Sequence, residues 1–324
     1  MSNLKNIQSP IKNELAEFEP FFRKSVKSNI SLLDIVTNYI IKRKGKQMRP
    51  MFVFLTAKML GKITESTYRA SALIELMHTA TLIHDDVVDD SNMRRGVFSI
   101  NALWKNKIAV LVGDFLLSKG MLIALENEEY DLLKIVSKAV RDMSEGELLQ
   151  IEKARKLDID EDVYFNIIRK KTAVLIASCL ATGGKSVGAD TEQVEKLWKV
   201  GELAGIAFQI KDDLFDYQKT NLTGKPSGND IKERKLTLPL IHALKNTSKS
   251  EQKHILSLLK KKNKSDKIIS EITNFAKENN GLEYTERMMI QYKDEALNLL
   301  NEFTKNEARE ALIELINYSI TRVK

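Results

Sequence analysis

The sequence predicts an all-α protein, because residues that make turns are scarce and apolar residues recur with the spacing of a helix. Proline accounts for 5 of the 324 residues and glycine for 14, where average usage would give about 16 and about 23. No proline lies between Pro50 and Pro226. An all-β chain needs a turn signal every ~8–12 residues, so this composition excludes an all-β fold.

Apolar side chains at intervals of three and four residues predict successive helices around 73–81, 110–121, 174–180 and 197–207. Breaks are expected at 42–47, 94–97, 182–188 and 219–234. The last break is the only long polar stretch that holds glycine and proline together, and a loop longer than about 12 residues is usually functional or disordered. No alternating run is long enough for a buried strand. We therefore expect one all-α domain over residues 1–324.

The chain carries 51 basic and 44 acidic residues, a net charge of +7, which favours nucleic acid, an anionic membrane surface or phosphate-bearing substrates as partners. Basic and aromatic residues are not interleaved, so no nucleic acid is expected. The single cysteine, Cys179, excludes an intramolecular disulfide, and its small apolar neighbours indicate a buried structural thiol. The first 20 residues hold no apolar signal region, and no stretch reaches ~18 uncharged apolar residues. We expect a cytoplasmic protein without a transmembrane segment.

The segment HDDVVDD ends an apolar stretch with aspartates that a helix would gather on one side. At about 100° per residue, Asp85, Asp86 and Asp89 project into an arc of about 100°. Like charges at this spacing each cost a helix about 0.2–0.5 kcal/mol, so the cluster indicates a counter-ion. For one such cluster alone, an acidic turn that complements a helix dipole is the alternative.

The segment KDDLFDY repeats the pattern with Asp212, Asp213 and Asp216, again after an apolar helix. Two such faces meeting across a bundle would supply only oxygen ligands, which favours Mg²⁺ over Zn²⁺. Protein-bound Mg²⁺ usually keeps waters and shares phosphate oxygens of a substrate. Basic residues close to these motifs in sequence are candidates for binding that phosphate: Lys46, Arg49, Arg94, Arg95, Lys171, Lys225 and Lys235.

The motifs GKQMRP, HDDVVDDSNMRRG, KTA, FQIKDDLFDY, GKPSGND and KLTLPL occur in this order between about residue 43 and residue 244. In this combination the sequence resembles the trans-polyprenyl diphosphate synthases. The resemblance implies a large all-α bundle around a central active-site cavity, usually in a homodimer. It also implies a Mg²⁺-dependent head-to-tail (1′–4) condensation of isopentenyl diphosphate with an allylic prenyl diphosphate, which releases pyrophosphate. Peripheral membrane contact for product release is a further expectation.

The resemblance assigns roles to the residues of the matching motifs. The implied metal ligands are Asp85, Asp86, Asp89, Asp212, Asp213 and Asp216. The implied contacts of the isopentenyl diphosphate are Lys46, Arg49, His78 and Arg95, and those of the allylic diphosphate are Arg94, Lys171, Lys225 and Lys235. The implied catalytic residues are Lys171, Thr172 and Gln209, the last two facing the developing carbocation.

The implied reaction ionises the allylic substrate, adds the double bond of isopentenyl diphosphate to the resulting cation, and removes a proton. Metal ions and fixed cations stabilise the leaving pyrophosphate, and an apolar pocket keeps water from the carbocation. No protein base is evident, and the resemblance implies that released pyrophosphate serves. Three departures from the family pattern leave substrate affinity open: Gln47 for an arginine, Arg234 for a glycine, and no Lys-Pro pair after Gly96.

Product length can be argued from the helix before the first motif, where Met77, Thr81 and Asp85 share a face. Ala80 and Thr81 are small where the resemblance implies a bulky aromatic in short-chain members, so we expect growth beyond farnesyl. The floor of the cavity is then expected two turns, about 11 Å, further along the helix. The candidates for that floor are Met77, Leu117 and Met121. We favour heptaprenyl to octaprenyl products for quinone side chains. A short-chain farnesyl or geranylgeranyl diphosphate synthase is the alternative.

Three other interpretations stay open at this point. A di-iron carboxylate bundle would use Glu-x-x-His pairs, which occur as Glu75 with His78 and Glu251 with His254, but it leaves both aspartate clusters unexplained. A terpene cyclase shares the first aspartate motif but usually has a different second one. A non-catalytic regulatory partner of a prenyl synthase would be expected to have lost one cluster.

Overall fold

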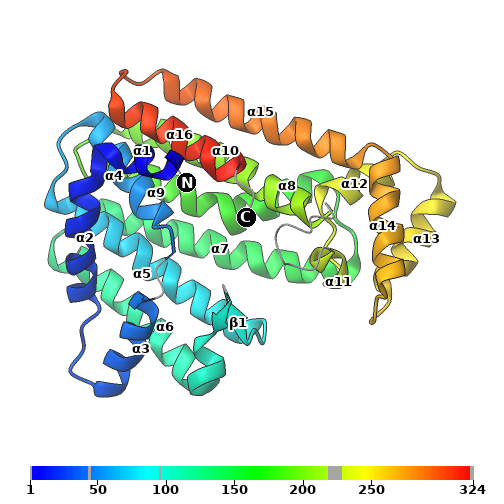
Figure 1. The fold of residues 1–324 in the computed structure, drawn as a ribbon, viewed down its shortest axis with the longest axis horizontal. Coiled ribbons are helices and arrows are strands. Elements are labelled where there is room, and N and C mark those ends of the chain that lie inside the picture. Colours follow the sequence, from blue (N-terminus) through cyan, green and yellow to red (C-terminus); the bar gives the residue numbers. More distant parts are fainter. Residues whose placement is uncertain (1, 43–44, 95, 218–227, 322–324) are drawn as a thin grey trace. The chain divides into compact units, whose positions relative to one another are not determined.

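Helices make up nearly all the regular structure of the computed structural model, which describes residues 2–42, 45–94, 96–217 and 228–321 (Figure 1). The predicted all-α fold is confirmed. In these ranges the only strands are β1 (Met93–Arg94) and β2 (Val97–Phe98), a small antiparallel hairpin. The hairpin lies at the break expected at 94–97.

Contacts between residues divide the chain into two compact units. The first consists of Met1–Val140, Ser178–Trp198 and Phe303–Leu312, and the second of Arg141–Ala177, Lys199–Glu302 and Ile313–Lys324. The expectation of a single domain stays a prediction.

The helices occur along the chain in the following order. Up to the middle of the chain they are α1 (Ser2–Gln8), η1 (Ser9–Ile11), α2 (Lys12–Ser25), α3 (Ser31–Lys42), α4 (Met48–Leu60), α5 (Glu65–Val88), α6 (Ile100–Glu126) and α7 (Tyr130–Lys156). Then come α8 (Glu161–Ile168), η2 (Arg169–Ala173), α9 (Val174–Lys185), α10 (Thr191–Asp216), α11 (Asn229–Lys232), α12 (Leu238–Lys245), α13 (Lys249–Lys260), α14 (Asp266–Glu278), α15 (Gly281–Asn301) and α16 (Glu307–Thr321).

Helices α5 and α6 lie side by side and form the core of the first unit (Figure 1). Helix α5 starts at a capping box in which Thr64 and Thr67 satisfy each other's backbone N–H groups. Its buried face joins residues of α3 and α6 in one apolar cluster, which contains Val36, Ile41, Leu76, Ala80, Ile83, Val112 and Leu116. The end of α5, which carries the first aspartate motif, is therefore fixed by the packing of α6.

Two glycines of α6 allow this close packing. A Cβ atom on Gly113 would lie 2.1 Å from Nε2 of His84, and one on Gly120 would lie 3.2 Å from Cδ1 of Leu73. The His84 ring, which directly precedes the first aspartate motif, therefore lies over the α6 backbone. Its Nε2 is 3.2 Å from the carbonyl oxygen of Val110. Gly113 thus sets the position of the residue before Asp85.

Cys179 of α9 is a buried thiol, as expected. No part of its surface is exposed, and burial raises the pKa of the thiol to about 12. At neutral pH the thiol is protonated, so the nucleophilic thiolate form is absent. Cys179 is therefore a small apolar core residue.

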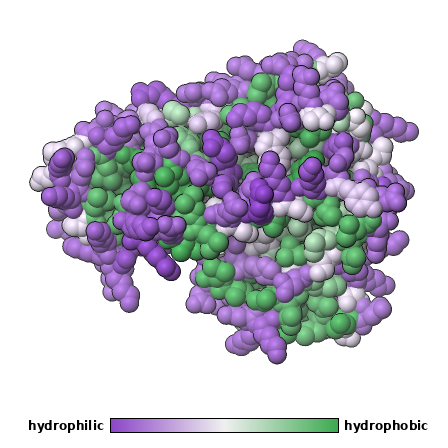
Figure 2. Space-filling view, turned by 180° about the vertical axis from the view of Figure 1, so that it is seen from behind, coloured by the Kyte–Doolittle hydropathy of each residue, from purple (hydrophilic) through white to green (hydrophobic). Residues whose placement is uncertain are grey.

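The outer face of α6 is apolar and exposed. The helix is interrupted at Lys105, with φ 71° and ψ 160°. Beyond this break its exposed apolar side chains are Val110, Leu111, Met121, Leu122 and Leu125, which span an arc of about 120° at about 100° per residue; the exposed Asp114 lies within the same arc. Among the described helices α6 alone is long and apolar enough to cross a membrane, and 33% of its most apolar window is buried. Core helices of soluble proteins meet the same criterion. Figure 2 shows apolar surface in the region of α3 and α6.

In the second unit, a π-helical turn, η2, continues directly from α8 and contains Lys171 and Thr172. Two neighbouring helices, α10 and α7, pack against this turn through glycine residues. A Cβ atom on Gly205 of α10 would lie 2.5 Å from Cα of Ala173, and one on Gly146 of α7 would lie 2.9 Å from the backbone N of Lys171. π-Helical turns frequently occur at functional sites, and here the two glycines fix the turn from two directions.

Replacing Gly205 should test this packing directly. Gly205→Ala places a methyl group against backbone, which cannot move aside as a flexible side chain can. We expect a loss of about 1–3 kcal/mol in the free energy of unfolding, measured by chemical denaturation. Gly61→Ala is the matched control, because its Cβ would meet only Val187 at 3.8 Å. Equal stability of both variants would contradict the close-packing argument.

Candidate functional site

The first aspartate motif lies at the end of α5 and just beyond it. Asp85 and Asp86 are in the last helical turn, and Asp89 follows the helix, with its N–H donating to the Asp85 carbonyl at 2.8 Å. The prediction that all three are helical therefore holds for the first two only. Asp86 is buried, Asp85 is half-buried and Asp89 is exposed.

Arg94 binds the first motif in this structure. Its Nε donates to Oδ1 of Asp86 at 2.7 Å, and Arg94 itself lies on β1, the strand that follows the end of α5. The Asn101 side chain donates to the Asp86 carbonyl at 3.2 Å. Asp86 thus has a cationic partner within its own unit. The neighbouring Arg95 lies outside the described residues.

The residues expected to bind isopentenyl diphosphate belong to the first unit. Lys46 is exposed just before α4, Arg49 is half-buried in its first turn, and His78 is buried on α5. Gln47 has a left-handed backbone with φ 51° immediately before α4.

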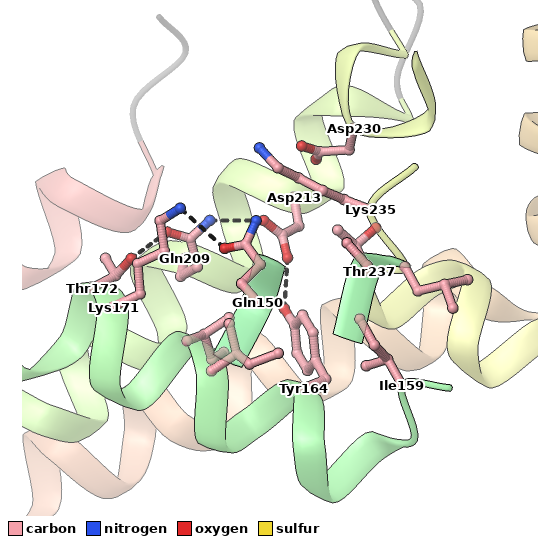
Figure 3. A pocket seen from close by; sticks show the side chains of 14 residues that line it. Gln150, Ile159, Tyr164, Lys171, Thr172, Gln209, Asp213, Asp230, Lys235 and Thr237 are labelled. Carbon is pink, nitrogen blue, oxygen red and sulfur yellow. Dashed lines mark hydrogen bonds between the residues drawn. The ribbon is translucent and has the colours of Figure 1, made fainter. Parts of the chain in front are cut away.

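The second aspartate motif lies at the end of α10 and opens onto a pocket within the second unit (Figure 3). The pocket holds about 630 Å³ of empty space, part of it open to solvent. Its polar lining contains Gln150, Tyr164, Lys171, Thr172, Gln209, Asp213, Asp230, Lys235 and Thr237. Its apolar lining is Ala154, Ile159, Ile167, Ile168 and Leu236.

Asp213 is the most constrained carboxylate of this pocket, with 5% of its surface exposed. The Tyr164 hydroxyl donates to its Oδ2 at 2.7 Å, and Nε2 of Gln209 donates to its Oδ1 at 2.8 Å. The Thr172 hydroxyl in turn donates to Oε1 of Gln209 at 2.8 Å. Figure 3 shows this chain of hydrogen bonds from the π-helical turn to the acid.

Burial raises the pKa of Asp213 to about 8, and the nearby Asp230 carboxylate adds to the rise. Burial also raises the pKa of Asp230 to about 6, where Asp216 adds to the rise and Lys235 opposes it. These carboxylates are crowded and desolvated, so a cation in the pocket would stabilise their ionised forms.

Asp216, the last residue of α10, binds the backbone at the start of α11. Its two carboxylate oxygens accept the backbone N–H groups of Asn229 and Asp230, at 3.0 and 2.9 Å, and so hold the start of α11. Asp212 is half-buried one residue before Asp213. The intervening residues 218–227, including Lys225, lie outside the description.

Both described lysines expected at the allylic diphosphate already have acidic partners. Nζ of Lys171 lies 2.5 Å from Glu147 and 3.0 Å from Oε1 of Gln150, both on α7. Nζ of Lys235 lies 2.5 Å from Glu233. Burial by itself lowers the pKa of Lys235, but the Glu233 and Asp230 carboxylates outweigh it and the net shift is upward. The Lys235 ammonium group therefore stays charged and can bind phosphate.

Among the described residues, no three acidic, histidine or cysteine side chains already form a metal site. The donor set nevertheless fits Mg²⁺, because the crowded groups offer only carboxylate oxygens. Mg²⁺ is usually held by one or two carboxylates together with waters and substrate phosphate oxygens. A complete protein cage is therefore not required.

The residues expected to set product length are divided between core and surface. Met77 and Ala80 are buried on α5, and Thr81 is half-buried with its hydroxyl donating to the His78 carbonyl. Leu117 packs against the core cluster that contains Ala80. Met121, however, is 40% exposed on the outer face of α6.

Four polar pocket residues did not emerge from the sequence: Gln150, Tyr164, Asp230 and Thr237. Asp230 had a detectable signal, since it lies in the long polar segment expected to be functional. Tyr164 had none, because it reaches Asp213 across 49 positions of sequence.

A family model described as polyprenyl synthetase matches residues 30–276. An all-trans-nonaprenyl-diphosphate synthase (geranyl-diphosphate specific) of Rhodobacter capsulatus is 33% identical over 322 residues, which cover 98% of each chain. A crystal structure of polyprenyl synthase from Caulobacter crescentus, complexed with calcium and isoprenyl diphosphate, is 30% identical, with a TM-score of 0.89 and 98% of each chain covered. A geranylgeranyl pyrophosphate synthase of Bacteroides thetaiotaomicron is 37% identical, with a TM-score of 0.84 and coverage of 99% and 100%. With the matched segment spanning both aspartate motifs, the chain belongs to the polyprenyl synthetase family.

Proposed function

We propose that the chain is a long-chain polyprenyl diphosphate synthase. It condenses isopentenyl diphosphate with an allylic prenyl diphosphate in a Mg²⁺-dependent head-to-tail (1′–4) reaction, forms an all-trans product and releases pyrophosphate. The observation that carries this proposal is the pocket of the second unit, which combines a fixed buried carboxylate, Asp213, with the cations Lys171 and Lys235. Family membership makes the chain a prenyl transferase.

Mg²⁺ would be held by Asp85, Asp86 and Asp89 of the first motif and by Asp212, Asp213 and Asp216 of the second. When bound, the metal would neutralise the charge that develops on the departing pyrophosphate. The related Caulobacter protein contains calcium and isoprenyl diphosphate together, which supports a divalent cation at the substrate. A bound cation would also neutralise the negative charge of the carboxylates and so offset the energetic cost of burying Asp213 and Asp230.

The other pocket residues bind the diphosphate, stabilise the carbocation or exclude water. Lys171 and Lys235 bind the allylic diphosphate, together with Arg94 and Lys225. The Thr172 and Gln209 side chains form a fixed dipole next to Asp213, where they stabilise positive charge on the reacting carbons. Apolar residues of the lining, such as Ile168 and Leu236, keep water from the carbocation.

Isopentenyl diphosphate would be bound by Lys46, Arg49, His78 and Arg95. No side chain of the described pocket is required as the base, and we assign proton removal to released pyrophosphate.

The competing all-α interpretations lose their support. Of the second Glu-x-x-His pair, Glu251 accepts from the backbone N–H of Ser248 in a helix cap, and His254 lies 2.8 Å from Glu271 on the surface. These residues already have structural roles, so a di-iron site has no observation in its favour. Likewise, none favours a terpene cyclase over a synthase.

We also propose that the protein is a cytoplasmic homodimer that covers the apolar face of α6 with a second copy. Leu111, on that face, is 53% exposed, and burying such side chains is worth about 25 cal/mol per Å². Peripheral membrane contact for product release belongs to the same proposal.

Activity should appear with purified chain, Mg²⁺, labelled isopentenyl diphosphate and farnesyl diphosphate, with the products separated by length. Excess EDTA should abolish it. Asp85→Asn and Asp212→Asn should each lower kcat by roughly 10²- to 10⁴-fold, because several kcal/mol of charge stabilisation are lost. Asp90→Asn is the matched control, since asparagine tolerates the left-handed backbone of Asp90, with φ 49°. Undiminished activity in EDTA would contradict the proposal.

Ala80→Phe should shorten the main product by at least one isoprene unit, because the new ring fills space along α5 before the deeper residues are reached. Overpacking the buried cluster around Ala80 should also cost about 1–3 kcal/mol. Ala109→Phe overpacks the same cluster from α6 and controls for this loss of stability. An unchanged length distribution for Ala80→Phe would refute the role of this position.

Leu111→Lys should convert the proposed dimer into a monomer, measured by sedimentation equilibrium, because a charge on the α6 face would be desolvated in the interface. Leu148→Lys on α7 is the control, since Leu148 is 68% exposed and lies outside that face. If Leu111→Lys sediments like the unaltered chain, α6 is not the interface.

A further inference from the structure

Tyr164 contacts the second aspartate motif from a different helix. It belongs to α8, whereas Asp213 belongs to α10, and the bond of 2.7 Å between hydroxyl and Oδ2 is buried. Tyr164 is 3% exposed and Asp213 5% exposed. Figure 3 shows Tyr164 and Gln209 approaching the carboxylate from different sides.

The two donors together fix the plane of the Asp213 carboxylate. Tyr164 occupies one oxygen and Gln209 the other. A carboxylate has about four lone-pair positions, so each oxygen keeps one for a further ligand. Rotation about the side-chain bond would break both hydrogen bonds at once. The lone-pair positions that remain for a ligand therefore point in fixed directions.

The two donors are also linked to one another through α8 and η2. Gln209 is held by Thr172, which lies in the π-helical turn that continues from the helix of Tyr164. Asp213 is thus held both directly and through Gln209 by one continuous segment, Tyr164 to Thr172. This segment also carries Lys171, which the proposed function places at the diphosphate.

We infer that Tyr164 is a positioning residue that orients Asp213 toward the divalent cation before substrate binds. This inference rests on the proposed function. Hydrogen-bond partners of metal-binding side chains typically contribute 10- to 100-fold to metal affinity or activity. Tyr164 itself touches neither the reacting carbons nor the metal in this role.

The test measures metal binding without turnover. Mn²⁺ is titrated into the full chain in the presence of inorganic pyrophosphate, and free Mn²⁺ is followed by its electron paramagnetic resonance signal. Tyr164→Phe removes only the hydroxyl and should weaken Mn²⁺ binding about 10- to 100-fold. The Mg²⁺ concentration for half-maximal activity should rise by a similar factor.

Tyr284→Phe is the matched structural control. The Tyr284 hydroxyl donates to Glu161, which lies in the same helix as Tyr164 and outside the pocket. Both variants therefore remove one tyrosine–carboxylate hydrogen bond from α8. If Tyr284→Phe weakens Mn²⁺ binding as much as Tyr164→Phe, the effect is loosening of α8 and the positioning role is wrong.

A double-mutant cycle with Asp213→Asn decides whether Tyr164 acts through Asp213. In that background Tyr164→Phe should cause no further loss of Mn²⁺ affinity, and additive losses would overturn the inference. If the phenylalanine variant fails to fold, 4-aminophenylalanine at position 164 keeps a donor and should retain wild-type affinity, and loss of affinity there also overturns it. If the unaltered chain binds no Mn²⁺ with pyrophosphate, the proposed function itself fails. If it binds and Tyr164→Phe binds equally, only the positioning role fails.

Discussion

The buried carboxylate of Asp213 is the constraint on which the second unit depends. An ionised acid taken out of water is costly unless donors and opposite charge surround it. Here two side-chain donors from separate helices meet it, and its pKa is still raised to about 8, first by burial. The close packing of η2 at Gly205 places Thr172, which donates to the second of these donors, Gln209. A bound cation would stabilise these crowded carboxylates, so the energetic cost of burying them would contribute to the affinity for a metal and its substrate.

The first aspartate motif satisfies its buried acid differently. Asp86 is paired with Arg94, a cation supplied by the chain itself. When a diphosphate binds with Mg²⁺, the diphosphate would replace Asp86 as the partner of Arg94, and Mg²⁺ would replace Arg94 as the partner of Asp86. At the second motif the buried acid is met by neutral donors instead, the hydroxyl of Tyr164 and the amide of Gln209.

The helical fold and the acidic motifs could be predicted because both are local properties of the sequence. Turn-poor composition, apolar spacing and the doubled DDxxD pattern each lie within a short window. Tyr164 could not be assigned in this way, since its importance arises from a contact between helices. Met121 lies in an apolar stripe that suggested a cavity floor, and in the structure it is 40% exposed on the outer face of α6; its role in product length stays a prediction. Periodicity shows that a helix has an apolar face but not what covers it. The departure at Arg234 was visible in sequence, and its left-handed backbone, with φ 61°, explains why glycine would fit there.

The π-helical turn at Arg169–Ala173 has a consequence for how the surrounding sequence can change. One residue more per turn rotates everything that follows by roughly 100° relative to an uninterrupted α-helix. The continuous helical segment formed by α8, η2 and α9 therefore directs Tyr164 and Ile168 into the pocket, whereas it places Ala177 against the backbone of α10. Deleting one residue here would convert the π-helical turn into regular α-helix. The residues that follow would then turn their buried face outward and their exposed face inward. Evolution along this segment should consequently proceed by substitution, while changes of length accumulate in the connections elsewhere.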